Sequence, residues 1–283
     1  MTLHRFPKAF LFTVALGTCS TLAMAQPATK PLPPGSPTTE QMEAQASLLA
    51  RDAIIRGLAY LGNPELPLDP DALLIHAYLK DRFGLPELCA EKQGLAAIRK
   101  EPGGTLYKFL RITDTLSFRP DFLKMQGQGF DNITLAGMWY DKLEKPSVLT
   151  DRINASVLED TYVATHSLWA VAMARQCFGA NVDTLLEYRL VEKVKERMDQ
   201  IDPRWGDEGV EALAMLQYND SAYVPPYKYI QDLAGVQNPN GSWSVIPGQD
   251  VDGSQHTTVL ALWALLQYKP LAWPVQPRDM VVR

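Results

Sequence analysis

Apolar side chains recur at intervals of three and four residues over most of the chain after Glu40, the spacing that places them on one face of an α-helix. The first such run, from Leu48 to Leu61, is followed by Gly62-Asn63-Pro64, a sequence typical of a helix end. Alternating β-branched residues are scarce, so we expect no sizeable sheet. Glycine, proline or aspartate stands at most joints between the further helices, which we predict over 69–83, 87–99, 104–112, 131–143, 157–178, 183–199, 207–218, 224–236 and 254–268.

Two kinds of predicted helix alternate in the C-terminal half of the chain. The segments 168–173, 212–218 and 262–268 resemble one another and are apolar nearly all round, with many alanines. The segment 183–199 lies between the first two and is rich in charged residues. Helical hairpins that repeat every 40 to 50 residues fit this pattern. We therefore predict an all-α fold in which buried inner helices alternate with solvated outer ones, arranged as a closed (α/α) toroid or an open solenoid.

The first 25 residues have the pattern of a secretory signal peptide. Basic residues come first, an apolar run from Ala9 to Leu16 follows, and the segment ends with Ala23-Met24-Ala25. The apolar run is shorter than the roughly 20 residues that span a bilayer. Lipidation of Cys19 is a weaker alternative, because Thr18 stands where a small residue is needed. We expect cleavage after Ala25 and a periplasmic or secreted protein.

The mature chain is predicted to contain a linker and one domain. Residues 26–39 include five prolines and form the linker, and residues 40–283 form the helical domain. The full chain is 46% hydrophobic and 21% charged, which is ordinary for a protein that buries a core. Its net charge of −5 becomes −7 without residues 1–25, because that segment holds two bases and no acid. Such a balance argues against nucleic acid as a partner, and no further segment is long enough to be an integral membrane span.

Cys89 and Cys177 are the cysteines of the mature chain. An oxidising compartment would allow a disulfide between them, and two free thiols are the alternative. No pair of cysteines or histidines has the spacing of a structural zinc site, so we expect no metal and no cofactor.

One motif resembles a known family. Leu233, Gln237, Gly241 and Trp243 have the form L-x3-Q-x3-G-x-W, which is similar to the QW repeat of terpenoid cyclases and protein prenyltransferase β subunits. The resemblance covers one hairpin and implies an (α/α) toroid. In this motif Gln237 caps backbone groups, Gly241 permits a tight turn and Trp243 stacks on the glutamine, so we expect a structural role for all three.

His76, His166 and His256 are separated by ninety residues each time. In a ring of repeated hairpins such spacing could place them at equivalent positions, and we interpret His166 and His256 as general bases that face the centre. Local hydrogen bonding of buried or surface histidines is the alternative. Asp252 lies in a D-x-D pair similar to part of the D-x-D-D motif of class II terpenoid cyclases, and it or Ser254 could instead cap a helix.

The stretch Thr165 to Ala170 is similar to the N-N-H-x-Y-W stretch of alginate lyases, but Thr165 and Leu168 replace its asparagine and tyrosine. Trp169, Tyr218 and Trp263 are candidate ligand contacts. Because no catalytic motif is complete, we expect a protein that binds a glycan or an apolar small molecule in a central cleft lined from the N-terminal ends of inner helices. A polysaccharide lyase or a class II cyclase, using His166, His256 and Asp252, is the alternative.

Overall fold

The structure is a computed structural model that describes residues 37–102, 104–113, 129–156, 161–201, 205–220, 222–249 and 252–274. The chain divides into two units, Met1–Pro37 and Thr38–Arg283. The predicted signal peptide and most of the predicted linker lie outside the described residues.

The all-α prediction is confirmed. Within the described residues the only pairing of the β type is an isolated antiparallel bridge between Trp243 and Ser254. The α-helices are α1 (Thr39–Leu61), α2 (Pro70–Phe83), α3 (Glu91–Arg99), α4 (Thr105–Phe109), α5 (Gly129–Met138), α6 (Ser147–Ser156), α7 (Thr161–Phe178), α8 (Thr184–Gln200), α9 (Asp207–Asn219), α10 (Tyr227–Gly235) and α11 (Gln255–Leu266), and the 3-10 helices are η1 (Leu110–Ile112), η2 (Tyr140–Lys142) and η3 (Lys269–Leu271).

Side-chain caps fix the starts of α2 and α11. Asp69 accepts a hydrogen bond from the backbone N–H of Ala72 and so begins α2, with Pro70 in its first turn. Ser254 does the same for α11 by accepting from the N–H of Thr257. Of the two predicted capping residues at this position, Ser254 is therefore the one that caps. Each cap sets which residues fall in the first helical turn.

Buried and solvated helices alternate as the sequence pattern predicts. In α9 every residue from Gly209 to Asn219 is buried, and in α11 every residue from Thr257 to Leu266 is buried. Met215 and Trp263 are each 1% exposed, and Trp169 of α7 is partly buried against the core. In α8, by contrast, the buried side chains form a stripe one helical turn apart, namely Leu186, Leu190, Val194 and Met198.

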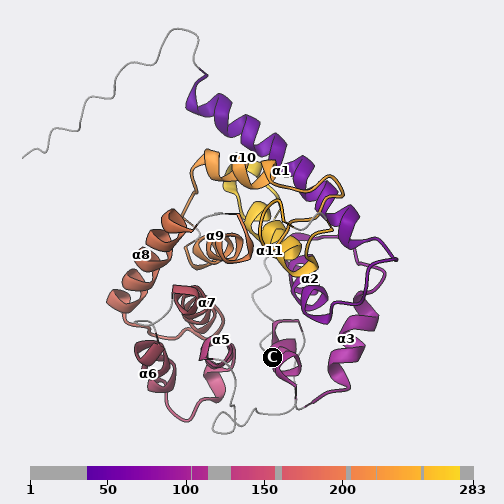
Figure 1. Ribbon diagram of the computed structural model, residues 1–283. Helices are drawn as coiled ribbons and strands as arrows, with labels where there is room; N and C mark the ends of the chain where they lie inside the picture. The colour runs from indigo at the N-terminus through magenta and orange to yellow at the C-terminus, as the bar shows by residue number, and fades with distance from the viewer. Residues whose placement is uncertain are drawn as a thin grey trace, which may run out of the picture. The chain divides into compact units, whose positions relative to one another are not determined.

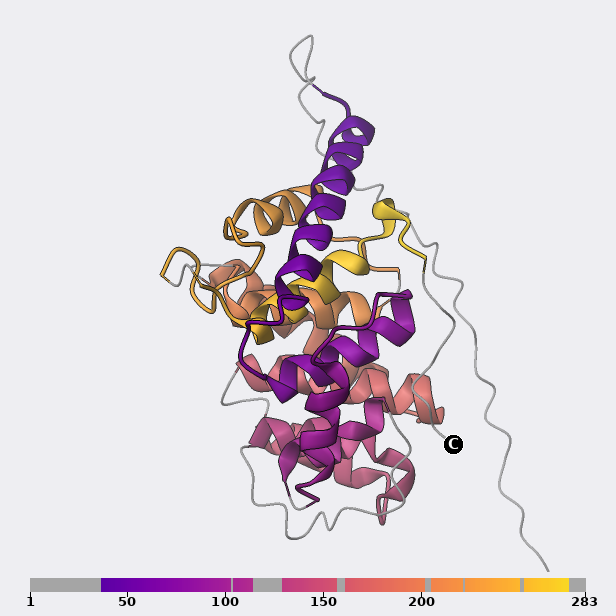
Figure 2. The same cartoon turned by 90° about the vertical axis from the view of Figure 1, so that its right-hand side faces the viewer.

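The inner helices pack in a continuous series. Helix α11 contacts α2 and α9, α9 contacts α7, and α7 contacts α5. Figure 1 shows α8, α10 and α1 on the outer side of α9 and α11, where α8 packs on α7 and α9, and α1 packs on α10 and α11. In the turned view of Figure 2, α1 (indigo) crosses over the C-terminal helices. Further contacts run from α5 through α4 and α3 back to α2.

Some predicted helix boundaries were wrong, and the helix predicted from residue 224 begins at Tyr227. The segment predicted to be helical from 87 begins its helix at Glu91, because Leu88 is buried in the turn before it. The segments 104–112 and 131–143 each form a shorter α-helix that changes to a 3-10 helix. Helix α6 was not predicted, since its buried side chains, Leu149 and Ile153, give only two points of a helical stripe.

The disulfide considered between the two mature cysteines is not formed. Cys89 is exposed in the turn before α3, a helix that packs on α2 and α4. Cys177 lies in α7, which packs on α5, α8 and α9. The two cysteines therefore lie among different neighbouring helices.

Candidate functional site

A pocket of about 380 Å³ collects residues from the N-terminal parts of the inner helices. Its polar members lie in the first or second turn of α2, α4, α5, α7, α9 and α11. The other part of the lining is apolar and includes aromatic rings. The polar lining residues are Asp71, Thr105, Asp131, Tyr162, His166, Glu211 and His256.

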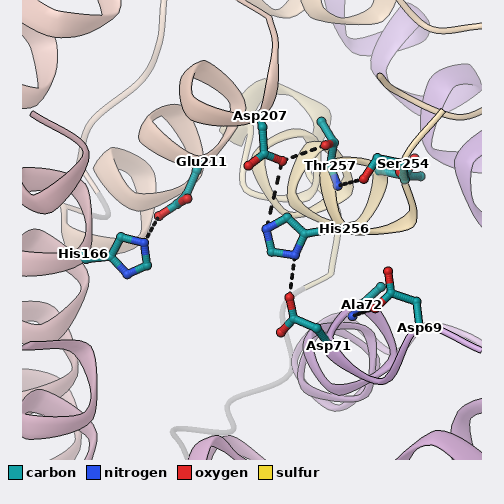
Figure 3. Close-up of polar contacts among 10 residues, drawn as sticks. Asp69, Asp71, Ala72, His166, Asp207, Glu211, Ser254, His256 and Thr257 are labelled. Atoms are coloured by element: carbon teal, nitrogen blue, oxygen red, sulfur yellow. Dashed lines mark hydrogen bonds and ion pairs between the residues drawn. The ribbon is translucent and has the colours of Figure 1, made fainter. Parts of the chain in front are cut away.

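His166 of α7 faces the carboxyl group of Glu211 on one side (Figure 3) and contacts the hydroxyl of Thr134 on the other. Its Nδ1 lies 2.9 Å from Oγ1 of Thr134, and that hydroxyl donates to the carbonyl oxygen of Phe130 at 3.2 Å. With the threonine proton used in this way, the hydrogen bond at 2.9 Å is donated by His166 Nδ1. His166 Nε2 is then the unprotonated nitrogen, and it lies 3.2 Å from Oε1 of Glu211.

Burial keeps both of these groups uncharged near pH 6. Burial, together with the charge of His256, lowers the pKa of His166 to about 3. Burial and the charge of Asp207 raise the pKa of Glu211 to about 8. Neither His166 Nε2 nor Glu211 Oε1 has a hydrogen-bond partner in the described part of the chain. The pair is therefore an unprotonated imidazole nitrogen beside a carboxylic acid.

Tyr162 completes this side of the pocket. It forms a side-chain hydrogen bond with Glu211, and its ring lies edge-on to His166 with a centroid distance of 4.8 Å. Burial and the charge of Glu211 raise the pKa of Tyr162, so its hydroxyl keeps its proton at neutral pH. The phenol can therefore act as a proton donor beside His166.

His256 of α11 lies between two carboxylates from other helices (Figure 3). Its Nδ1 is 2.7 Å from Oδ2 of Asp71 in α2, and its Nε2 is 4.0 Å from Oδ1 of Asp207 in α9. Burial alone would lower the pKa of His256, but the hydrogen bond to Asp71 and the charges of Asp71 and Asp207 raise it to about 9. Asp207 is fixed by the hydroxyl of Thr257, which donates to it at 2.6 Å.

The two histidines of one pocket thus have opposite protonation states at neutral pH. His166 can accept a proton, while His256 carries one that it can donate. Titratable groups whose environments push their pKa values apart are typical of acid–base sites. Chemically, this arrangement can transfer protons to and from a ligand placed between α7 and α11.

Aromatic side chains line the apolar part of the pocket. Trp169 and Trp263 meet edge to face with a centroid distance of 5.6 Å, and Phe109 lies against Trp169 at 6.5 Å. Tyr78 and Tyr218 also meet Trp263 edge to face, with centroid distances of 5.3 and 5.6 Å. The tryptophans are therefore held in fixed orientations by their neighbours.

The structure brings together some of the residues predicted from the sequence and separates others. His166, His256, Trp169 and Trp263 line the same pocket. Asp252 is exposed and does not line it, and its backbone carbonyl accepts a hydrogen bond from Asn240. Tyr218 is buried behind Trp263 and is not in the lining.

His76 also lies outside the pocket. It is fully buried, and its Nδ1 is 2.9 Å from Oε2 of Glu91, a carboxylate that Lys80 also contacts. This group joins α2 to α3. The equal sequence spacing of the three histidines therefore does not place His76 with the other two.

The residues of the L-x3-Q-x3-G-x-W motif form a brace between α10 and α1. Nε2 of Gln237 donates to the carbonyl oxygens of Ala53 and Gly241, both within 2.9 Å. The indole N–H of Trp243, a fully buried residue, donates to the carbonyl oxygen of Leu233 at 2.8 Å. These hydrogen bonds join the motif to backbone groups of α1 and α10.

Sequence reasoning missed Asp131, Tyr162, Asp207 and Glu211. Only Glu211 gave a usable signal, because it is the one charged residue between Gly209 and Tyr218, in a segment that otherwise has the composition of a core. A charged residue in such a segment is rarely buried without a reason. The partners of the histidines gave no signal, since they come from helices distant in sequence.

The described residues contain no group of three or more histidine, cysteine, aspartate or glutamate side chains arranged to hold a metal ion. None of the helices in the described ranges combines the length and apolar character that crossing a bilayer requires. Comparison of the chain with protein-family models, curated proteins and solved structures finds no match. Fold and site define an all-α protein with a pocket whose lining combines aromatic and aliphatic side chains with titratable groups.

Proposed function

We propose that this protein binds a small molecule with an apolar body and one polar group, in the pocket between the N-terminal ends of the inner helices. The observation that carries the proposal is the composition of the lining, in which aromatic and other apolar side chains outnumber the polar ones. Pockets of about 300 to 1,000 Å³ with few polar groups are the usual form of small-molecule sites. A glycan could stack on the same aromatic rings, but the aliphatic walls favour a less polar body.

A toroidal arrangement and export from the cytoplasm are part of the same proposal. The series of contacts from α2 through α11, α9, α7 and α5 and onward through α4 and α3 supports an (α/α) toroid. The basic, apolar and small-residue pattern of residues 1–25 supports a periplasmic or secreted location. The protein would then bind its ligand outside the cytoplasm.

A neutral fluorescent probe tests the binding proposal. N-phenyl-1-naphthylamine is apolar and emits more strongly when it leaves water, so titration of the mature chain should give saturable binding. Leu106→Trp adds bulk to the pocket lining and should weaken the affinity at least tenfold, whereas Leu48→Trp adds the same bulk at an exposed position of α1. Absent binding, or equal affinity in both variants, would contradict the proposal.

Acid–base catalysis is the second candidate, favoured by the opposite protonation states of His166 and His256. In an elimination, His166 Nε2 would take the proton from the carbon next to a carboxylate. The C–O bond on the neighbouring carbon would break as a C=C bond forms between the two carbons, and Tyr162 would protonate the leaving oxygen. His256 would balance the negative charge that develops on the carboxylate.

Uronate polysaccharides test this second candidate. A lyase would release unsaturated products that absorb in the ultraviolet, and His166→Ala would abolish their release while the circular dichroism spectrum stays unchanged. If no polymer yields product, the lyase candidate is rejected. The binding proposal would be unaffected, because it requires no turnover.

A further inference from the structure

The charges around the pocket are strongly one-sided. Asp71, Asp131 and Glu211 line it, and Asp207 faces it beside His256. No lysine or arginine is among its lining residues in the described part of the chain. His256 is the one lining cation there, and it is already paired with Asp71 at 2.7 Å.

The helix N-termini around the pocket do not reverse this balance. Exposed N–H groups at the start of a helix attract anions, and several inner helices begin here. However, three of these helices carry a carboxyl group in their own first turn. These groups are Asp71 in α2, Asp131 in α5 and Asp207 in α9. The partial positive charge of these helix ends is therefore already offset by the protein.

Aromatic rings surround the same carboxyl groups. Phe130 packs against Tyr162 with a centroid distance of 5.2 Å and against His166 at 4.8 Å, next to Asp131 in the sequence. Trp169 and Trp263 lie further along the lining. The faces of aromatic rings carry partial negative charge and attract cations, most strongly where water is excluded.

Glu211 points to an occupant of this space. Its side chain is 5% exposed, it lines the pocket, and its Oε1 has no hydrogen-bond partner while it lies 3.2 Å from an imidazole nitrogen that carries no proton. A carboxyl oxygen left in this state is costly unless a donor or a cation completes it. Asp131 is a second carboxyl group of the lining, and burial and the charge of Asp71 raise its pKa.

We propose that the polar group of the ligand is a cationic nitrogen, an amine or a quaternary ammonium, held by Glu211 and Asp131 with the aromatic rings around it. The inference rests on the proposed binding function and names its ligand class. It also separates the two candidate functions, because a uronate is an anion.

Binding of such a cation should release a proton from Glu211. The carboxyl group is largely protonated at pH 7, and a nearby positive charge favours its ionised form. The affinity for a quaternary ammonium ion, which has no titratable proton of its own, should therefore rise by about tenfold from pH 6 to pH 8. The titratable groups that face Glu211 or share its pocket are Tyr162 and His166 of α7, Asp207 of α9, His256 of α11, Asp71 of α2 and Asp131 of α5.

Three probes that each contain one benzene ring but differ in charge test the proposal by isothermal titration calorimetry at pH 8. Benzyltrimethylammonium is a cation, benzyl alcohol is neutral and phenylacetate is an anion. We expect the cation to bind at least tenfold more tightly than the other two. Phenylacetate or benzyl alcohol binding as tightly as the cation would overturn the proposal.

Charge-removing variants locate the effect. Glu211→Gln and Asp131→Asn should each weaken binding of benzyltrimethylammonium about fivefold to tenfold while the affinity for benzyl alcohol stays constant. Glu211→Gln should also abolish the dependence on pH between 6 and 8. Glu192→Gln removes a carboxylate from the outer helix α8, where it pairs with Lys195, and should change neither affinity. Unchanged affinity for the cation in both pocket variants would contradict the assignment.

The neutral probe N-phenyl-1-naphthylamine distinguishes failure of the cation preference from failure of the proposed binding function. If it binds in the pocket and benzyl alcohol displaces it but benzyltrimethylammonium does not, the pocket is a ligand site and only the cation preference is wrong. If the neutral probe does not bind, the proposed function itself fails and the inference fails with it.

Discussion

Glu211 and His166 face each other across 3.2 Å in the pocket, and the proton of the pair belongs to the acid rather than to the imidazole. The usual histidine–carboxylate pair has the opposite distribution, an imidazolium beside a carboxylate. Burial explains the difference, because two neutral groups need no desolvation of charge. His256 and Asp71, which are less deeply buried, form the usual charged pair a short distance away.

These states predict how stability varies with pH. The folded-state pKa values of Glu211 and His256, about 8 and about 9, exceed their unfolded values near 4.5 and 6.5. Each group therefore stabilises the fold below its unfolded pKa, and that stability is lost as the pH rises toward the folded pKa. His166 acts in the opposite sense, but only between pH 3 and 6.5. From pH 6.5 to 9 the free energy of unfolding should fall by about 2–3 kcal/mol, after allowance for the solvent exposure of His256.

Glu211→Gln checks the source of this loss. The amide has the shape of the protonated acid and does not titrate. The variant should gain stability relative to the wild-type chain as the pH rises from 6 to 9, by about 2 kcal/mol over that range. Urea unfolding at several pH values measures the difference, and a constant difference between the two chains would contradict the assignment of Glu211 as a buried acid.

Asp71→Asn should change the charge state of His256. Without the carboxylate, burial opposes the imidazolium more strongly, and the pKa of His256 should fall by about 2 from its value of about 9. Titration of the histidine ring signals by NMR measures it directly. Asp69→Asn is the matched control, since Asp69 caps α2 through the N–H of Ala72 and asparagine caps equally well. If the two variants gave the same pKa for His256, the pairing with Asp71 would be wrong.

Helix positions were predictable where local chemistry sets them. The end of α1 at Gly62, the start of α2 after Asp69 and the cap of α11 at Ser254 all follow from residues that favour helix ends. Helix α6 was missed because its short stripe of two buried side chains is too weak a pattern. The burial of α9 and α11 was predictable because their own apolar residues occupy nearly every side of each helix.

The candidate site was predictable only in part. The sequence indicated that His166 and His256 lie at corresponding places of inner helices, and both line the pocket. It gave no indication that Asp71 pairs with His256 rather than with His76, five residues away on the same helix. The choice of partner depends on how α2, α3 and α11 pack, and packing is a property of the whole fold.

Gly137→Ala tests the close approach between α5 and α7. A Cβ atom at Gly137 of α5 would lie 2.3 Å from the carbonyl oxygen of Ala170 in α7, so the helices would have to separate. We expect a loss of about 3 kcal/mol in the free energy of unfolding. Gly235→Ala, at the exposed end of α10, meets no atom within 4 Å and should be neutral or stabilising by up to about 1 kcal/mol. Equal effects of the two changes on thermal unfolding would contradict the tight contact of α5 with α7.

Gly241→Ala tests the brace between α10 and α1. The residue has φ +93°, and a Cβ atom there would lie 2.4 Å from the carbonyl oxygen of Arg56 in α1. Gly248→Ala is the matched control, because its φ of +78° imposes a similar backbone strain while no atom lies within 4 Å. The control should cost about 1 kcal/mol and Gly241→Ala about 3 kcal/mol. In hydrogen exchange, Gly241→Ala should also reduce protection of the α1 amides near Arg56, because Gln237 would lose its hold on the carbonyl of Ala53. If both variants lost the same stability, only backbone strain would act at Gly241, and the contact between the motif and α1 would contribute nothing.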